Sequence, residues 1–256
     1  MPGLPNSLVL RLASGEEDLR AVQRLRYEVF VRELGGDGPL VDHAAGLERD
    51  AFDAGAEHLA LFDPALPKGD DAVAVYRLID LDAARRGHGF YSAAEYDLGP
   101  LLSGGRRLLE FGRSCVRAGH RDGTALFALW QGLARHVADC GAEVLFGVAS
   151  FHGTDAEALA QPLSFLHHRH LAPPELRVRA VGDAARRMDL LPPDAVDRRA
   201  AVAALPPLLK AYLRLGGFVG EGAWVDHAFN TVDVCLVVDA ARLSAQGRAL
   251  YGTPRA

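Results

Sequence analysis

The chain has 256 residues, of which 49% are hydrophobic and 24% charged, as in an ordinary globular protein that can bury a large core. A formal net charge of −5 argues against a broad basic surface, so we expect no nucleic-acid partner. No window approaches the roughly 18 consecutive apolar residues of a membrane-spanning helix, and residues 1–5 lack the start of a secretory signal. These features predict a cytoplasmic protein.

The chain begins with a predicted strand and a long helix. Residues 8–13 alternate between apolar and polar side chains, which predicts a strand. Apolar residues then recur at helical spacing over residues 16–33, with Ser14 as the expected N-cap. The pair Gly35-Gly36 is expected to end this helix.

A long loop and three strands are expected next. Residues 37–55 are polar and show no periodicity, and loops of that length are often functional. Strands are predicted over residues 58–62, 72–79 and 108–116, with an irregular or partly helical segment between the last two.

The second half of the chain alternates between helices and strands. Helices are predicted over residues 124–140, 155–168 and 208–215, and strands over residues 144–149 and 232–238. Strands on both sides of a central helix, with several consecutive strands before it, predict a mixed α/β sheet rather than a βαβ repeat. The glycine patterns of dinucleotide-binding and phosphate-binding loops are absent from the sequence.

Two charged residues interrupt the otherwise apolar strand over residues 108–116. Glu110 and Arg113 are costly to bury unless they pair or serve a site. Their odd spacing points them to opposite faces of a regular strand, but Gly112 between them can host a bulge that re-aims one side chain. A buried ion pair that only stabilises the sheet is the alternative interpretation.

Further charges lie in apolar or loop surroundings upstream. Arg26 lies on or beside the apolar face of the first helix, and Arg77 lies in the strand over residues 72–79. Asp50 and Asp53 end the long loop. Each has an ordinary explanation, which is snorkelling for the arginines and exposure for the acids. Their combination in this order is more informative.

In that order the motifs resemble those of acyl-homoserine lactone synthases, relatives of the GNAT-type acetyltransferases. The matching positions are Arg26, Val29, Phe30, Asp50, Asp53, Arg77, Leu78, Glu110 and Arg113. The chain is more similar to another branch, the ornithine Nα-acyltransferases of ornithine-lipid synthesis. That resemblance runs from about residue 8 to residue 238 and includes residues 26–31, 110–116, 209–216 and 226–234. Lactone synthases carry a tryptophan shortly after the first-helix motif, whereas residues 33–36 contain none.

The resemblance implies a fold and a reaction. The fold is a GNAT-like mixed β-sheet flanked by helices with a helical C-terminal elaboration, in one domain over residues 1–256. The reaction is transfer of a (3-hydroxy)fatty acyl group from acyl carrier protein to the α-amine of L-ornithine. The product is a lyso-ornithine lipid, which a separate O-acyltransferase would complete. No bound cofactor is implied, because the phosphopantetheine thioester of the carrier is a co-substrate. Peripheral contact with the inner face of the cell membrane, acyl length, oligomeric state and the strictness for ornithine are left open.

The resemblance also implies roles for site residues. Glu110 is the candidate general base, acting directly or through a water, and backbone N–H groups at Gly112 would meet the oxyanion. Arg26, Arg77 or Arg113 would clamp the ornithine carboxylate. The remaining candidates for substrate contact are Phe30, Asp50, Asp53, Asp226, Asn230 and Asp233. The lactone synthases also carry the Asp50 and Asp53 motif but not the C-terminal block. Asp226 and Asp233 are therefore the better candidates for the side-chain ammonium of ornithine.

A basic turn follows the strand over residues 108–116. Residues 117–123 do not have the glycine spacing of the loop that holds the pyrophosphate of coenzyme A, which a carrier-bound phosphopantetheine lacks. Arg117, His120 and Arg121 are therefore expected to contact acyl carrier protein, with an ordinary solvated turn as the alternative.

Two other features are weak candidates. The run His167-His168-Arg169-His170 lacks the spacing of zinc ligands, so no metal is expected. Cys115 lies in an apolar strand without a base, which favours a structural thiol. Two alternatives to the ornithine enzyme remain: an acyl-homoserine lactone synthase, and a non-catalytic module that binds acyl carrier protein.

Overall fold

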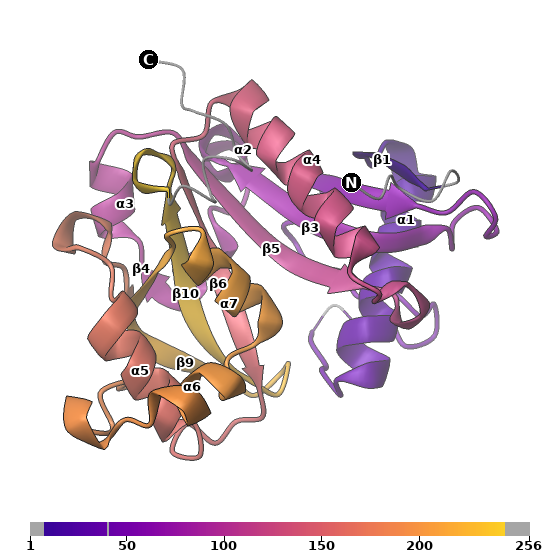
Figure 1. Cartoon of the computed structure of the whole chain (residues 1–256). Coiled ribbons are helices and arrows are strands. Elements are labelled where there is room, and N and C mark those ends of the chain that lie inside the picture. The colour runs from indigo at the N-terminus through magenta and orange to yellow at the C-terminus, as the bar shows by residue number, and fades with distance from the viewer. Residues whose placement is uncertain (1–7, 40, 244–256) are drawn as a thin grey trace. The chain divides into compact units, whose positions relative to one another are not determined.

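The computed structural model describes residues 8–39 and 41–243. Contacts between its residues group the chain into two compact units. The first unit comprises Met1–Gly89 and Phe111–Cys140, and the second comprises Phe90–Glu110 and Gly141–Ala256. Strand β5 (Leu108–Val116) therefore gives its first residues to the second unit and the others to the first. Figure 1 labels all seven α-helices of the described residues and several of the strands.

Three antiparallel strands form the sheet of the first unit. These are β1 (Val9–Leu12), β2 (Glu57–Phe62) and β3 (Ala72–Asp80), with β2 in the middle. Every residue from Ala72 to Ile79 is buried, although successive side chains point to opposite faces. Both faces of β3 are thus covered, and helices α1 (Gly15–Arg26) and α4 (Thr124–Cys140) contact this strand.

The first helix changes its character midway. It continues from α1 into the π-helix η1 (Tyr27–Glu33), a rare form that is frequent at functional sites. Gly35 then adopts φ +73°, which ends the helix as expected. Ser14 lies at the N-cap, but its side chain makes no capping bond; its N–H instead donates to Asp18 at 2.8 Å. The unit is completed by α2 (Leu81–Arg86) and η3 (Ala118–His120).

The second unit is built around two long antiparallel partners. β6 (Val144–His152) pairs in parallel with the start of β5 and antiparallel with β10 (Thr231–Asp239), which pairs with β9 (Phe218–Asp226). Three short strands extend this sheet from β9: β7 (Arg179–Ala180), β8 (Ala185–Arg186) and β4 (Tyr96–Asp97). The α-helices of this unit are α3 (Gly99–Ser103), α5 (Ala160–His170), α6 (Arg198–Ala204) and α7 (Pro207–Arg214). Short 3₁₀ turns are η2 (Tyr91–Ala94), η4 (Pro174–Leu176), η5 (Pro193–Ala195) and η6 (Ala240–Arg242).

Strand β9 was not predicted, and its glycines explain why. A Cβ on Gly220 would lie 2.6 Å from Val178 Cγ2 and 2.9 Å from the Val178 carbonyl oxygen, so glycine allows the close approach of the neighbouring chain. Gly222 adopts φ +84°, which only glycine adopts without strain. These glycines interrupt the alternation by which a strand is recognised in sequence.

Helix α5 begins later than predicted. The expected start was residue 155, but Asp155 caps a turn by accepting bonds from the N–H groups of Glu157 and Ala158 at 3.0 and 3.1 Å. The helix proper therefore runs over Ala160–His170. Within residues 8–39 and 41–243, no helix combines the length and apolar character needed to cross a bilayer.

Candidate active site

The first unit gathers five of the predicted charged residues into one network. Arg26, whose side chain is fully buried, donates from Nη1 to Asp53 Oδ1 at 2.7 Å and from Nη2 to Asp53 Oδ2 at 2.9 Å. Its Nε donates to the carboxylate of Glu48, and Nη2 also donates to the Glu48 carbonyl at 2.9 Å. Gln23 adds a further donor to Asp53 at 2.9 Å.

Arg77 and Arg113 close the network. Arg77 Nη1 lies 2.6 Å from both oxygens of Asp50 and 3.2 Å from Asp53 Oδ1. Arg113 donates from Nε to Glu48 Oε1 at 3.3 Å and from Nη2 to Asp50 Oδ2 at 3.1 Å. Each carboxylate is therefore shared by two arginines. We call this set the arginine–carboxylate ring: Arg26, Glu48, Arg113, Asp50, Arg77 and Asp53.

The ring balances its own charge. Burial acts to raise the pKa of Asp53, but the charges of Arg26 and Arg77 outweigh it and hold this pKa well below its usual value. Burial likewise acts to raise the pKa of Asp50, but the charges of Arg77 and Arg113 outweigh it and hold this pKa below its usual value. Burial and the charge of Arg26 lower the pKa of neighbouring His58 to about 4, so this imidazole is neutral at pH 7. All three carboxylates have guanidinium partners, and the ring's formal charges sum to zero.

Glu48 is a ring member that sequence reasoning missed. It lies two residues before Asp50 in the predicted long loop, and its side chain is 1% exposed. The signal available was an acid directly after Leu47, which is itself buried. An acid in a polar loop gives no indication of burial until the partners across the fold are known.

A cavity of about 250 Å³ adjoins the loop that carries Asp50 and Asp53. It is lined by Phe52, Ile79, Arg86 and His88 among others, and the rings of Phe52 and His88 make an edge contact at 6.0 Å. Arg77 places its guanidinium 5.4 Å from the centre of the Phe52 ring. The predicted Phe30 is half-buried and packs against a core cluster that includes Val22 and Leu25.

The backbone irregularity in β5 falls one residue later than predicted. Arg113, rather than Gly112, adopts a left-handed conformation, with φ +50°. Gly112 does not adopt a positive φ, and a Cβ placed on it would meet no atom within 4 Å. The backbone at Gly112 is therefore unstrained, and open space lies beside it. A non-glycine residue at positive φ is strained and often marks a functional site.

Glu110 belongs to the second unit, where it caps the 3₁₀ turn η2. Its side chain is buried, and its oxygens accept bonds from the N–H groups of Ser92 and Tyr91, both at 2.7 Å. The hydroxyl of Ser92 donates to the same carboxylate. Sequence reasoning missed Ser92, which lies in the segment expected to be irregular or partly helical. These three donors fix the position of the Glu110 carboxylate.

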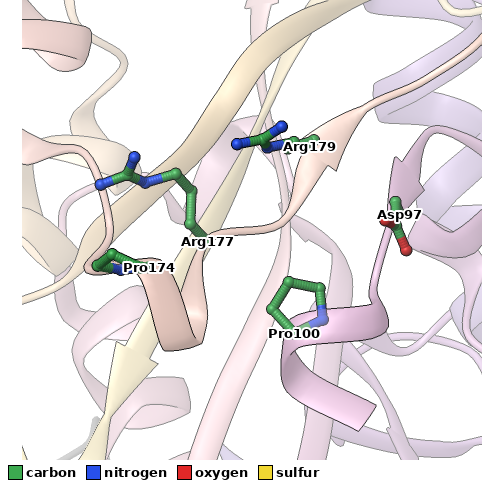
Figure 2. Close-up of a pocket in the computed structure, with 5 residues that line it drawn as sticks. All are labelled: Asp97, Pro100, Pro174, Arg177 and Arg179. Carbon is green, nitrogen blue, oxygen red and sulfur yellow. The ribbon is translucent and has the colours of Figure 1, made fainter. Parts of the chain in front are cut away.

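An arginine-lined cavity of about 270 Å³ lies elsewhere in the second unit (Figure 2). Asp97, Pro100 and Pro174 line it together with Arg177 and Arg179. Both guanidiniums have partners: Arg177 Nε donates to the Ala172 carbonyl at 2.7 Å, and Arg179 Nε lies 3.2 Å from Glu221. The positive charges of Arg177 and Arg179 are therefore partly offset by other groups of the protein.

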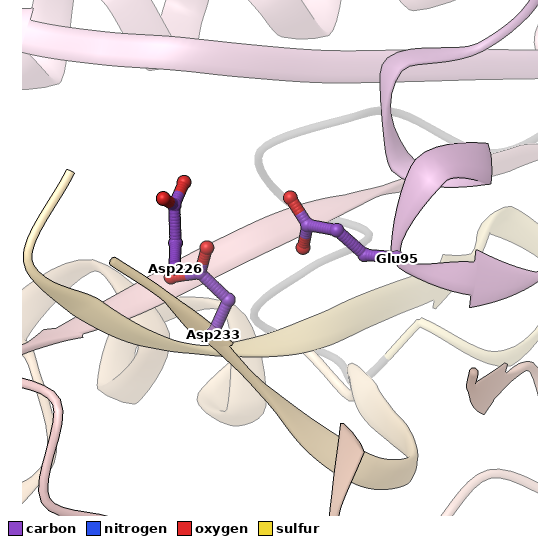
Figure 3. Close-up of side chains that lie close together, drawn as sticks. All are labelled: Glu95, Asp226 and Asp233. Carbon is purple, nitrogen blue, oxygen red and sulfur yellow. The ribbon is translucent and has the colours of Figure 1, made fainter. Parts of the chain in front are cut away.

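Three buried carboxylates meet near the β9–β10 turn (Figure 3). Asp226 ends β9, Asp233 lies in β10, and Glu95 immediately precedes β4. One oxygen from each lies within 4.8 Å of the others, and all three residues are buried. Figure 3 shows their carboxylates turned toward a common space. We call this set the acidic cluster. Three carboxylates this close together favour the binding of a cation. Asp226 and Asp233 were predicted from the sequence, whereas Glu95 was not.

Neighbouring groups hold the acidic cluster in place. Tyr96 donates its hydroxyl to the carbonyls of Asp233 and Gly222 at 3.0 and 3.2 Å, and burial raises the pKa of this phenol well above its usual value. Asp226 Oδ1 accepts bonds from two N–H groups of the following turn at 2.8 and 3.0 Å. Asn230 completes that turn at φ +53°, a conformation that asparagine tolerates.

The predicted carrier-binding residues each have an acidic neighbour. Arg117 donates to Asp70 at 3.0 Å, His120 lies 3.6 Å from Asp63, and Arg121 donates to Glu33 at 2.6 Å. Their positive charges are thus locally offset, which weakens the basic surface expected from the sequence. Arg121 remains 45% exposed and accessible to a partner.

The two weak candidates have unreactive surroundings. Burial raises the pKa of the Cys115 thiol to about 12, so it remains protonated at neutral pH. His168 Nε2 lies 2.8 Å from the Leu191 carbonyl. Within the described part of the chain, the one grouping of three possible metal ligands is the acidic cluster, which includes no histidine.

Comparison with known proteins places this geometry in context. The family model of the acetyltransferase (GNAT) domain matches residues 25–131. A protein of Rhodobacter capsulatus named L-ornithine N(alpha)-acyltransferase is 55% identical, covering 98% of this chain and 97% of that protein. Proteins of the same name from Brucella abortus and Rhizobium meliloti are 39% and 41% identical, covering 98% and 96% of this chain and 90% and 84% of their own lengths.

The solved structures bear on the fold alone. A CoA-dependent acyl-homoserine lactone synthase, BjaI, solved with MTA, aligns with a TM-score of 0.50 at 16% identity, covering 97% of this chain and 91% of that one. Together with the family match, this likeness confirms the predicted GNAT-like mixed sheet with flanking helices.

Proposed function

Because this chain belongs to the L-ornithine Nα-acyltransferase family, we propose that it transfers a fatty acyl group from a thioester donor to the α-amine of L-ornithine. The observation that carries the proposal is 55% identity to a relative of that name over nearly the full length of both chains. The alternative of a lactone synthase has the order of the motifs and a fold-level likeness in its favour, but residues 33–36 lack the tryptophan of those enzymes. The residues expected for acyl transfer, including Glu110, are all present, which counts against a non-catalytic module.

The finer parts of the proposal concern donor and product. The donor is a (3-hydroxy)acyl thioester of acyl carrier protein, and the product is an N-acylated ornithine. A free 3-hydroxyl on that product suits a second acylation by a separate O-acyltransferase. We also propose that residues 1–256 form one acyltransferase domain, with a core over residues 8–238.

The chemistry requires a neutral amine. Glu110 takes a proton from the α-ammonium of ornithine, directly or through a water, and the amine nitrogen attacks the thioester carbonyl carbon. The tetrahedral oxyanion is met by backbone N–H groups at Gly112 and Arg113. The C–S bond then breaks, the nitrogen loses its second proton to give the amide, and the leaving carrier thiolate takes up a proton. Of the three candidate carboxylate clamps, Arg113 is the most accessible at 11% exposed, against 0% for Arg26 and 3% for Arg77.

The acidic cluster supplies the partner for the side-chain ammonium of ornithine. Replacing Asp226 or Asp233 with Asn, or Glu95 with Gln, is expected to remove a charge-assisted contact and lower the preference for ornithine over norvaline by about tenfold. The ratio of kcat/KM for the two amines measures this, because norvaline lacks only the side-chain amine.

The matched control for the cluster variants is Asp239→Asn, because Asp239 lies in the same strand, β10, as Asp233. Asp239 is also buried, but it pairs with Arg106 at 2.6 Å outside the acidic cluster, so the variant should keep the ornithine preference. Full preference in all three cluster variants would make the cluster structural and move specificity to Asp50 and Asp53. Loss of activity on chelation with EDTA would instead identify the cluster as a metal site.

The carrier proposal makes a separate prediction. Charge reversal at Arg117 and Arg121 should raise the KM for acyl carrier protein thioester several-fold, more so at low salt, because the carrier is acidic. Arg135→Glu on the exposed face of α4 is the control for a general change in charge. Initial rates with carrier-bound and coenzyme A-bound donors measure the effect. Equal turnover of the two donors would show that the carrier is not the specific donor.

A further inference from the structure

The histidine-rich run at the end of α5 lines the wall of a cavity. His168, Arg169 and His170 form the last turn of α5, and together with Arg198 at the start of α6 they line a space of about 420 Å³. Helices α5 and α6 are in contact (Figure 1). The rest of the lining is apolar and consists of Phe165, Pro193 and Val196. No acidic side chain is part of this wall, and its volume is that of a small-molecule site.

The two arginines differ from most others in this protein. Within residues 8–39 and 41–243, Arg169 and Arg198 form no ion pair and no hydrogen bond, although both line the cavity and both are exposed. The nearest acid in sequence, Asp197, directs its carboxylate to the N–H groups of Arg199 and Ala200 at 2.8 and 3.1 Å. In the cavity of Figure 2, by contrast, both arginines have partners. The cavity between α5 and α6 thus has a positive charge that no described side chain neutralises.

The histidines fit the same chemistry. Burial and the charge of Arg198 lower the pKa of His170, which is evidence of positive potential at this wall. His170 also packs against the ring of Phe165, with 5.2 Å between ring centres, which sets its orientation. Two planar guanidiniums offer more donors than the two oxygens of a carboxylate require. A phosphate ester presents three acceptor oxygens and up to two charges.

We propose that this cavity binds the phosphate group of a small soluble phosphate ester, with Arg169 and Arg198 on the phosphate and the apolar wall against the organic part. The site goes beyond acyl transfer, and its test requires no catalysis. Only a phosphate monoester has this chemistry, because the phosphopantetheine arm of a carrier is attached through a phosphodiester. A free metabolite and free 4′-phosphopantetheine are therefore the two monoesters tested.

Isothermal titration of the full chain measures binding of glycerol 3-phosphate and of 4′-phosphopantetheine. Glycerate and pantetheine are the matched ligands, one carrying a carboxylate in place of the phosphate and the other lacking it. We expect saturable binding of both esters, and at least about tenfold weaker binding of the matched ligands. Binding of one ester alone would identify its source and also supports the site. Equal binding of glycerate and glycerol 3-phosphate, or no saturable binding of either ester, would overturn the proposal.

Variants locate the binding. Arg169→Gln and Arg198→Gln should each weaken ester binding at least about tenfold, and Arg198→Lys should recover part of the loss by keeping the charge. Arg199→Gln removes the same charge from the same helix but leaves the cavity wall intact, so it should bind as the native chain does. An equal loss in Arg198→Gln and Arg199→Gln would refute a specific pocket. Binding to phosphatidylglycerol vesicles without binding of either soluble ester would also refute it.

Discussion

Replacement of Glu110 with Gln is expected to lower the rate of acyl transfer at least about 100-fold, since general-base catalysis contributes that much or more. The amide cannot take a proton from the ornithine ammonium. The variant also places an amide N–H₂ against one of the donors at Tyr91, Ser92 or the Ser92 hydroxyl, so some loss of stability accompanies the loss of rate. Single-turnover rates with a saturating donor, together with denaturant unfolding, measure the two effects separately.

Ser92→Ala is the control for the capping role of Glu110. It removes the hydroxyl donor and leaves both backbone N–H groups in place, so it disturbs the cap without removing the carboxylate. We expect this variant to keep most of the rate. Retention of more than about a tenth of the native rate in Glu110→Gln would reject the base. A Glu110→Gln protein that fails to fold, combined with a fully active Ser92→Ala protein, would favour the structural interpretation.

The elements predicted correctly are those whose burial follows directly from local pattern. The helix over residues 124–140 and the strand over residues 108–116 match α4 and β5 at both ends. Periodicity was strong in the helix, and glycines bounded it. In α1 the same periodicity predicted one continuous helix but could not distinguish the π-helical turns of η1. The difference lies in hydrogen-bond register, which side-chain spacing does not specify.

The charged site was predictable as a set of residues but not as a set of contacts. Five ring members were candidates from their order in the sequence, yet Arg26, Arg77 and Arg113 were expected to meet substrate. In the structure each already holds carboxylates of the same chain. Which acid reaches which arginine depends on how a loop folds over the sheet. For the same reason Glu48 and Glu95 could not be distinguished from solvated loop acids.

Arg26→Met is expected to lower the free energy of unfolding by about 3–5 kcal/mol, because it leaves Glu48 and Asp53 as buried charges with one guanidinium fewer. Arg32→Met is the control in the same helical run. Arg32 is 65% exposed, pairs with Glu28 one turn away and lies 5.7 Å from the centre of the Tyr27 ring, so its loss should change stability by less than about 1 kcal/mol. Denaturant unfolding of both variants at pH 7 measures the difference.

The pH dependence of the stability lost in Arg26→Met tests whether that loss is electrostatic. The folded-state pKa values of Asp50 and Asp53 are depressed, so their contribution to stability is complete above the unfolded pKa of about 3.9 and is lost as pH falls toward the folded values. Removal of Arg26 raises the folded pKa of Asp53, so the variant loses less stability than the native chain over that range. The difference in the free energy of unfolding between the native chain and Arg26→Met should therefore become smaller as pH falls below about 4.

A double-mutant cycle with Asp53→Leu separates the ion pair from simple packing. Arg26→Met/Asp53→Leu removes both partners, so it should be more stable than the sum of the single losses predicts. Additive losses would mean that Arg26 stabilises through its packing alone. A cost below about 1 kcal/mol for Arg26→Met, together with loss of acyl transfer, would show that the ring is not a structural element and that Arg26 is free to bind the ornithine carboxylate.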